Sequence, residues 1–454
     1  MDAEAGRTPR VPVTLRMVLA IAVPMTIAHV TTPLIGITDT AVIGQLGAVP
    51  LLGAVALGAL LFSFIGACTN FLRMGTTGLV AQAMGAGDRE GEATALWRSL
   101  FLAALLGIAV VVLQGPILAL FLAAMNPSAE VADATGLYWR VRVWAVPFML
   151  ANYAILGWLL GLARARTGLL LQLVLSLINI AGSLLLVLVF DFAIAGVAAA
   201  SVAAEIVVFA FSCGLVARAV QAGARPTLAA VFERAGFRHT LAVNRDILIR
   251  SLLLMASYSM FMAVSARLGD LTLATNAVLM NLFMLSAHVL DGLATAAEQL
   301  GGRAVGARDR AAFARTLRLT VLAGLVIGVA LALIWLATGP FAIRLITAAD
   351  EVRAMSGSYL VWAALTAPAG VLAFVMDGLF IGATWTGTMR NMMLAATATF
   401  ALVLWLTVDT LGNHSLWLAL NVWLLARGLT LWAFVPTLTR RTFAPRAGPA
   451  SGAV

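Results

Sequence analysis

Long apolar runs separated by short polar or charged turns repeat along the whole chain. A helix needs about 20 predominantly apolar residues, at about 1.5 Å of rise each, to cross the hydrocarbon core of a bilayer. Twelve runs meet this length, so the pattern predicts an all-α polytopic membrane protein with twelve transmembrane helices. The expected spans are Met17 to Gly44, Leu51 to Val80, Ala95 to Leu122, Leu137 to Leu160, Gly168 to Phe190, Ile194 to Ala217, Ile247 to Leu268, Thr272 to Ala297, Phe313 to Thr338, Gly357 to Ile381, Asn391 to Val408 and Ser415 to Leu438.

The longest connection, from Arg218 to Arg250, divides these spans into two sets of six. The expected organisation is an N-lobe over residues 1–220, a cytoplasmic inter-lobe loop over 221–246, a C-lobe over 247–438 and a cytoplasmic tail over 439–454.

An internal repeat relates the two sets at a constant offset of 221 residues. Gly85-Ala86-x-Asp88-Arg89 returns as Gly306-Ala307-x-Asp309-Arg310, and Tyr138, Pro147, Gly157 and Gly161 return as Tyr359, Pro368, Gly378 and Gly382. Six is an even number of spans, so both lobes have the same orientation. We therefore expect two six-helix lobes related by pseudo-two-fold symmetry along the membrane normal, a design typical of transporters.

Composition excludes most other classes. Of the residues 62% are hydrophobic and 11% charged, whereas a soluble domain has about 25% charged residues. The two cysteines, Cys68 and Cys213, lie inside apolar segments, so we expect neither a disulfide framework nor a metal site. The N-terminal segment lacks a cleavage pattern and is interpreted as leading into a retained first span.

Arginine supplies all 29 basic residues and gives a net charge of +9. Because arginine is retained in short cytoplasmic loops, its distribution predicts that both termini are cytoplasmic in the inner (plasma) membrane. No interleaved basic and aromatic stripe points to nucleic acid. The arginines expected at outer ends are Arg140, Arg142, Arg267, Arg344 and Arg353.

Several segments resemble the multidrug and toxic compound extrusion (MATE) family, in its DinF-like branch. They are PMTIAHVTTPLIGITDTAVIGQLG in the first span, FLRMGTTGLVAQAMGAGD at the end of the second, and ANYAILGWLLG, DGLATAAEQLGG and DGLFIGAT further along. The resemblance covers both halves of the chain. It implies export of organic cations and other amphiphiles in exchange for protons or sodium.

Ionisable residues inside the membrane cost about 2.5–3.5 kcal/mol on insertion scales, so each is a candidate functional group. Asp39, near the outer end of the first span, is the leading site, and the resemblance implies that it is the proton-titrating residue. The alternative is an aspartate that caps the helix at the water interface. Pro24 and Pro33 on the same span each remove a backbone hydrogen bond, so we expect the helix to kink there. Glu205, one turn after Ser201, is a second candidate for proton coupling.

Polar residues of the N-lobe accompany Asp39. The resemblance implies that Asn152, Asn179 and Ser201 line the same cavity and contact substrate, although hydrogen bonds between helices would also explain them. Ser183 stands where related sequences often carry a second aspartate, and a serine holds no charge. This departure favours protons over sodium as the coupling ion, since sodium needs several fixed oxygens.

The C-lobe carries its own polar stripe. His288, Asp291 and Glu298 share one helix face and form either a second ion or substrate determinant or a structural network. Asp377 and Arg390 are interpreted as gating or packing groups, and Arg73 as a structural tie. Met280 and Met284 are candidates for substrate contact, because flexible methionines suit promiscuous apolar surfaces, or they are ordinary core residues.

Together these features predict a monomeric secondary active multidrug antiporter, without cofactor or metal, that exports amphiphilic or cationic drugs by alternating access, with substrate competing against protonation of Asp39. A sodium-coupled exporter, or a flippase or organic-anion transporter of the same superfamily, is the alternative. No catalytic constellation occurs among the four histidines, so an enzyme is not expected.

Overall fold

The computed structural model describes residues 13–46, 48–221 and 226–444, and within these ranges it is helical without strands. Twelve segments of the described chain are long and apolar enough to cross a membrane, which confirms the predicted fold class. The N-lobe helices are α1 (Leu15–Gly44), α2 (Val49–Thr69), α3 (Phe71–Ala86), α4 (Arg89–Val112), α5 (Gln114–Met125), α6 (Ala129–Arg142), η1 (Val143–Ala145), α7 (Val146–Gly161), α8 (Ala165–Leu188) and α9 (Ala193–Gln221). They are followed by α10 (Leu228–Val231), α11 (Arg234–Arg267), α12 (Asp270–Gly306), α13 (Arg310–Ile346), α14 (Asp350–Gly382), α15 (Thr386–Leu411) and α16 (Asn413–Thr442).

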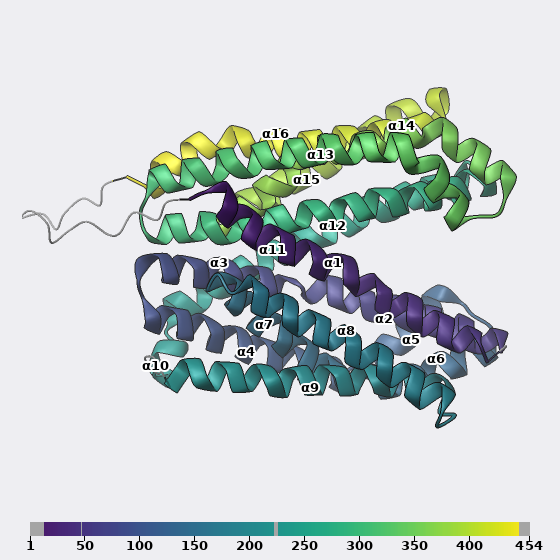
Figure 1. Cartoon of the computed structure of the whole chain (residues 1–454), viewed down its shortest axis with the longest axis horizontal. Coiled ribbons are helices and arrows are strands. Elements are labelled where there is room, and N and C mark those ends of the chain that lie inside the picture. The colour runs from purple at the N-terminus through teal and green to yellow at the C-terminus, as the bar shows by residue number, and fades with distance from the viewer. Residues whose placement is uncertain (1–12, 47, 222–225, 445–454) are drawn as a thin grey trace, which may run out of the picture.

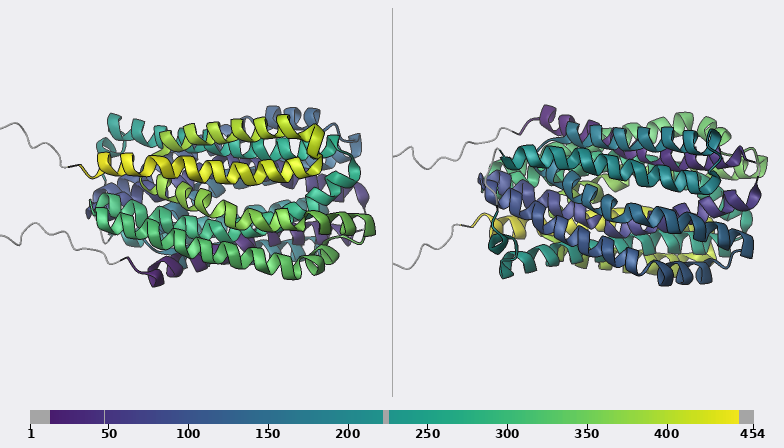
Figure 2. Two further views of the ribbon diagram at one scale, coloured as in Figure 1. Left: turned by 90° about the horizontal axis from the view of Figure 1, so that it is seen from above. Right: turned by 90° about the horizontal axis from the view of Figure 1, so that it is seen from below.

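The two lobes lie side by side, with their long helices running along one common axis (Figures 1 and 2). The described chain begins and ends at the same end of the molecule, which we call the terminal end. The turns after α3, α7, α12 and α14 also lie there, because each of these helices runs toward it.

Several spans differ from the sequence expectation. The second expected span is broken at Asn70 into α2 and α3, and the fourth passes through the short 3-10 helix η1. The latter break precedes Pro147, which lacks a backbone N–H and therefore suits the first turn of the next helix. α11 begins at Arg234 rather than near Ile247, so the predicted inter-lobe loop contains α10 and the first turns of α11.

The internal sequence repeat corresponds to glycine contacts that recur at equivalent places in the two lobes. An added Cβ on Gly85 would contact the backbone carbonyl of Arg303, and one on Gly306 would contact that of Gln82. These two contacts exchange under the 221-residue offset, so α3 and α12 cross backbone to backbone at the terminal end. Inside the lobes, Gly157 lies against the carbonyl of Arg73, and its equivalent Gly378 lies against that of Ala294.

α1 contacts both lobes. In its first half the hydroxyl of Thr26 donates to the carbonyl of Val289 on α12, at 3.3 Å, and an added Cβ on Gly292 would collide with Thr26. In its second half Asp39 accepts a hydrogen bond from Ser183 on α8. Figure 1 shows α1 running obliquely from the C-lobe at the terminal end to the N-lobe at the other.

We predict that Gly306→Ala destabilises the protein by about 1–3 kcal/mol, because its methyl group would enter the backbone of α3 at a packed crossing. Thermal unfolding in detergent measures the effect. The matched control is Gly357→Ala on α14, where nothing lies within 4 Å of the added Cβ. Since alanine favours helices over glycine, this control should be neutral or slightly stabilising, and equal losses in both variants would contradict the prediction.

Candidate functional site

A buried carboxylate forms the centre of a polar cluster in the N-lobe. Asp39 on α1 is 2% exposed. The Ser183 hydroxyl, from α8, donates to Asp39 Oδ1 at 2.8 Å, and Arg142 Nη1, at the end of α6, lies 4.0 Å from Oδ2. Three helices therefore converge on one carboxylate, at a position about five residues before the end of α1.

Arg142 links the two acids of this cluster. Its guanidinium lies 4.3 Å from the ring centroid of Phe62 and 5.2 Å from that of Tyr138, and its side chain is 12% exposed. Its charge acts on both Asp39 and Glu205. Contact with aromatic faces stabilises a cation that has lost part of its hydration.

The second acid is held by an asparagine. Asn152 Nδ2, on α7, donates to Glu205 Oε2 on α9 at 2.7 Å and to the Glu205 backbone carbonyl at 3.1 Å. Asn179 Nδ2 on α8 donates to Ser201 Oγ on α9 at 2.9 Å. The two asparagines thus connect α7 and α8 to α9. Their hydrogen bonds are to residues of α9 and not to Asp39.

The cluster keeps unused hydrogen-bonding capacity. The side-chain carbonyl oxygens of Asn152 and Asn179 are buried and have no hydrogen-bond partner among the described residues, and the same holds for Arg142 Nε. Buried polar atoms are normally satisfied, so such atoms indicate a place for water, a proton or a ligand.

A second ion pair crosses between the lobes. Arg73 Nη1 on α3 lies 4.0 Å from Glu298 Oε2 on α12, and the two side chains are 9% and 3% exposed. Glu298 Oε1 has no hydrogen-bond partner within the described chain. His29 on α1 is partly buried, and the charges of Arg73 and His288 both act on it. The pair lies between the terminal end and the middle of α12.

The C-lobe interior contains an arginine-rich group. Asp377 on α14 accepts hydrogen bonds from Arg250 on α11 and from Arg427 on α16. Arg427 also lies over the rings of Phe374 and Trp423, at 5.4 and 5.1 Å. Two cations therefore flank one carboxylate. The charges of both arginines also act on Asp291 of α12.

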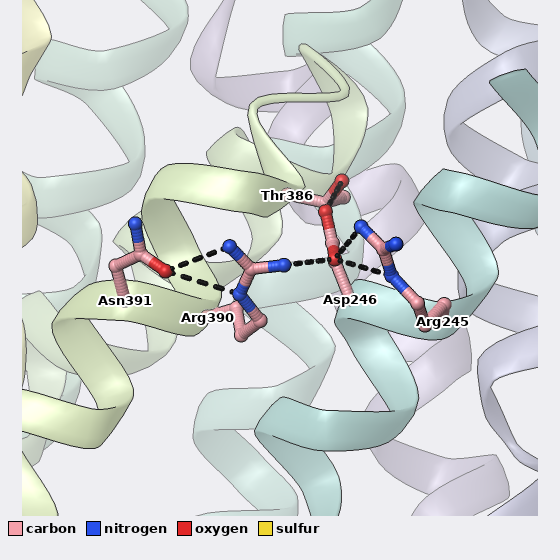
Figure 3. A network of polar contacts seen from close by, with 5 residues as sticks. All are labelled: Arg245, Asp246, Thr386, Arg390 and Asn391. Carbon is pink, nitrogen blue, oxygen red and sulfur yellow. Dashed lines mark hydrogen bonds and ion pairs between the residues drawn. The ribbon is translucent and has the colours of Figure 1, made fainter.

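A network around the buried Asp246 connects the start of α15 to α11 (Figure 3). Asp246 Oδ1 accepts from Arg390 Nη1 at 2.7 Å and from Arg245 Nη2 at 2.9 Å. Thr386 lies 3.5 Å from Oδ2, and Arg390 also donates to Asn391. These contacts hold the terminal end of the C-lobe together.

Comparison with known proteins decides the family. The MatE family model matches residues 24–185 and 247–406, which is most of both lobes. The chain belongs to the MatE family. DNA damage-inducible protein F of Escherichia coli (strain K12) is 38% identical over 414 residues, covering 91% of this chain and 90% of that protein, which confirms the DinF-like assignment. Probable multidrug resistance protein NorM of a Synechococcus strain is 33% identical over 172 residues, 38% of this chain and 37% of that one.

Solved structures share the MatE fold. A MOP superfamily transporter from Pyrococcus furiosus, whose binding pocket is described as having reverse polarity, gives a TM-score of 0.86 at 18% identity, with 94% of this chain and 96% of that chain covered. A multidrug resistance MATE family transporter in an outward-facing conformation gives 0.86 at 19% identity, with the same coverage. Members of the MatE family are membrane transporters, not enzymes.

The structure brings together some of the predicted site residues of this MatE protein and separates others. Asp39 and Ser183 are in direct contact, and Arg142 joins Asp39 to Glu205. Ser201 contacts Asn179 rather than Asp39. The interpretation of Asp39 as a helix cap does not fit its burial and its two partners. The functional roles of all these residues remain predictions.

The sequence places Arg142 among the arginines at outer ends, and in the structure it is the last residue of α6, within the fourth span. Its side chain turns into the N-lobe, because the buried Asp39 offers a partner and two rings cover it. Arg73, Arg250 and Arg427 are also buried. The one sequence feature that points to the inward position of Arg142 is that it follows Tyr138 by four residues on the same helix, so that its guanidinium can lie over the Tyr138 ring.

The predicted C-lobe stripe does not form one cluster. Glu298 pairs with Arg73 of the other lobe, whereas the charges of His288, Arg250 and Arg427 act on Asp291. Met280 is buried in the apolar core and Met284 packs partly buried against it. Substrate contact by either methionine stays a prediction. So does a kink at Pro24 or Pro33: α1 is helical through both, and the side chain of Pro33 lies outside the described residues. Within the described ranges no group of three or more His, Cys, Asp or Glu side chains could hold a metal ion.

We predict that Asp39 and Arg142 are energetically coupled. Arg142→Gln leaves a buried carboxylate without its cation and should lower thermal stability, whereas the same change in an Asp39→Asn background should cost less. The expected coupling is about 0.5–3 kcal/mol. Additive losses in the double variant would show that the 4.0 Å approach carries no net interaction.

We also predict that the Arg73–Glu298 pair helps to keep the terminal end closed. Spin labels at Arg89→Cys and Arg310→Cys, which are exposed and equivalent in the repeat, would report the distance between lobes in a protein without native cysteines. Arg73→Glu and Glu298→Arg should each shift the population toward longer distances through like-charge repulsion, and the double exchange should reverse part of the shift. An unchanged distance distribution in the single variants would contradict this.

Proposed function

We propose that this MatE protein is a multidrug efflux antiporter that exports amphiphilic and organic cationic compounds in exchange for protons across the inner membrane. The observation that carries the proposal is the buried Asp39, which accepts a hydrogen bond from the neutral Ser183 and has, among the described residues, the cation Arg142 4.0 Å away. A carboxylate in such surroundings is a group to which a proton or a cationic drug can bind, and each excludes the other.

The charge balance of the N-lobe cluster supports this choice of substrate. Asp39 and Glu205 contribute two negative charges when ionised, and Arg142 contributes one positive charge. The cluster then has one negative charge in excess, which attracts a monovalent cation. One proton restores neutrality and removes that attraction, so a single protonation is enough to release a singly charged drug.

The hydrogen bond from Ser183 suits a carboxylate that changes protonation state. A hydroxyl is both donor and acceptor. It donates to the ionised Asp39 at 2.8 Å, and it can accept from the protonated form after rotating its hydrogen. The hydrogen bond between Asp39 and Ser183 can therefore persist in both protonation states, with donor and acceptor exchanged.

The described lobe contacts support a state in which this cluster is reached from the side opposite the terminal end. Toward the terminal end, α1, α3, α12 and α14 pack closely through glycines, and the Arg73–Glu298 pair joins α3 to α12. Alternating access requires these contacts to part so that substrate enters from the cytoplasm. With both termini cytoplasmic, the protein then releases its substrate outside and takes up a proton there.

The driving force depends on stoichiometry. Exchange of one proton for one monovalent cation moves no net charge, so only the pH gradient contributes, at about 1.4 kcal/mol per unit. A neutral substrate, or two protons, would also use the membrane potential, at about 2.3 kcal/mol per 100 mV and charge.

Arg142 supports a second candidate function. A buried guanidinium beside the acids offers a site for the anionic group of an amphiphile, in line with an organic-anion transporter or flippase. The excess of acids over arginine in the cluster makes a cationic substrate the better choice. Competition between a cationic dye and an anionic one in the same efflux assay separates the two functions.

We predict that Asp39→Asn abolishes drug efflux in proteoliposomes under an imposed pH gradient, because the amide cannot exchange a proton. Its thermal stability should stay close to that of the parent. The control is Asp409→Asn, which removes an exposed acid of α15 and should leave efflux unchanged. Near-normal efflux by Asp39→Asn would move the coupling site to Glu205 or to the Asp291 and Glu298 stripe.

We predict that a sodium gradient alone, without a pH difference, drives no efflux, since Ser183 replaces a possible second carboxylate beside Asp39. Ser183→Asp should restore a pair of acids and is the variant in which sodium dependence could appear. Sodium-driven efflux by the parent protein would reject proton coupling as the main mode.

The orientation is tested by labelling single cysteines in intact cells, in a background with Cys68 and Cys213 replaced by serine. A membrane-impermeant reagent should modify Asp350→Cys, which is exposed at the end opposite the termini, and should leave Arg308→Cys unmodified. The reverse pattern would invert the proposed topology.

A further inference from the structure

A continuous apolar groove follows the outer wall of the N-lobe, away from the polar cluster. One part, of about 620 Å³, lies between α4, α7 and α9, and a second, of about 640 Å³, lies between α4 and α10. Both parts share Trp97 and Leu100 of α4, which makes them one groove. In Figure 1, α10 lies at the terminal end beside the start of α4 and the end of α9.

The groove is separate from the site proposed for transport. Its wall includes Ala151 and Phe209, whereas the neighbouring Asn152 and, one turn earlier, Glu205 bond to each other on the inner side of α7 and α9. The side chains that line the part between α4, α7 and α9 are all apolar apart from the thiol of Cys213. Trp97 and Ile108 are 44% and 60% exposed, so the groove opens on the face that the bilayer surrounds.

The length of the groove matches one leaflet. Its lining positions on α4 run from Trp97 to Ile108, which spans about 16 Å at 1.5 Å per residue. The hydrocarbon core of a bilayer is about 30 Å thick, so one leaflet supplies about 15 Å. An acyl chain whose headgroup lies at the terminal end would therefore fill the groove along its length.

The terminal end of the groove is basic. Arg98 follows the lining residue Trp97, and its guanidinium is anchored by the carbonyls of Ala230 and Val231, at 2.7 and 2.8 Å. Arg218 follows Ala217, another lining residue, and it is exposed, as are Arg234 and Arg238 at the start of α11.

Among the described residues, the acid that lies beside Arg98 at this end is Glu233. The carboxylate of Glu233 accepts from the backbone N–H groups of Ala235 and Gly236 at 2.8 and 2.6 Å, and it lies 3.8 Å from Arg98. The backbone hydrogen bonds hold the pKa of Glu233 below its usual range, so it stays ionised. Four arginines against one acid leave a positive excess at the place where a headgroup would lie.

α10 is fixed as an interfacial element above the groove. Leu228 is 79% exposed, and Phe232 packs edge-on against Phe101 at a centroid distance of 5.1 Å. Phe237 of α11 joins the same aromatic group. Apolar and aromatic side chains beside arginines are typical of segments that lie at the boundary between headgroups and acyl chains.

We propose that the groove binds an anionic phospholipid of the leaflet on the terminal side, with one acyl chain between α4, α7 and α9 and the headgroup beside Arg218 and Arg234. Apolar complementarity holds the chain. The basic end selects a negative headgroup over a zwitterionic one, because the attraction of each arginine for an anionic lipid adds to that of its neighbours.

The test uses Trp97 as a reporter. The protein is reconstituted into nanodiscs of phosphatidylcholine that contain a fixed fraction of phosphatidylglycerol, with bromine on the acyl chains of one lipid or the other. Bromine quenches tryptophan emission on contact, and the difference between the parent and Trp97→Phe isolates the Trp97 signal. We expect brominated phosphatidylglycerol to quench this signal at least twofold more than the same fraction of brominated phosphatidylcholine.

Two pairs of variants separate the chain site from the headgroup site. Ala104→Phe fills the groove, because Ala104 lines it and is exposed, and should reduce quenching by both lipids, whereas Leu105→Phe beside it should not. Arg218→Gln with Arg234→Gln should remove the preference for phosphatidylglycerol, whereas Arg315→Gln with Arg318→Gln, exposed on α13, should keep it. Thermal unfolding near that of the parent establishes that each variant is folded.

Equal quenching by the two brominated lipids would overturn the proposed selectivity, and quenching unaffected by Ala104→Phe would overturn the groove as the site. Release of quenching by a cationic drug, at concentrations that saturate efflux, would assign the groove to transported substrate instead of lipid. Failure of this proposal leaves the proton-coupled mechanism untouched, since none of these residues belongs to the Asp39 cluster.

Discussion

A charge inside the hydrocarbon region persists only when it has a partner, and this constraint organises the molecule. Each buried acid of the N-lobe is held by a group from another helix: Asp39 by Ser183 and Arg142, and Glu205 by Asn152. The same contacts that satisfy these charges fix α1, α6, α7, α8 and α9 relative to one another. We propose that a change in the charge of Asp39 acts on the position of α1, the helix that also packs against the C-lobe through Thr26.

The two lobes repeat their packing but not their charges. Glycine contacts recur at the 221-residue offset, as in Gly85 and Gly306. By contrast, the equivalents of Asp39, Arg142 and Glu205 are Met260, Ala363 and Ala426, and the equivalents of Asp377 and Arg427 are Leu156 and Ile206. A symmetric scaffold thus has an acid-rich cluster in one lobe and an arginine-rich one in the other. This asymmetry is the reason that we propose proton exchange in the N-lobe rather than in the C-lobe.

The sequence predicts the helices and the repeat because both depend on local apolar length and on glycine spacing. It also singles out Asp39, since an acid in an apolar run is conspicuous. It does not predict the partners of Asp39, because Ser183 lies 144 positions away and nothing in the sequence shows that the Arg142 side chain turns inward toward α1. The breaks at Asn70 and before Pro147 also escape it, since Pro368, at the equivalent place in α14, is accommodated inside a continuous helix.

The central claim is that a proton and a cationic substrate compete for one carboxylate. Proton release on drug binding tests it most directly: a cationic drug is added to the purified protein in weakly buffered detergent solution, and the pH change is compared with the amount of drug bound. The account predicts that the parent protein releases protons in proportion to bound drug and that Asp39→Asn releases none. Drug binding by the parent without proton release, or equal release by Asp39→Asn, would contradict it.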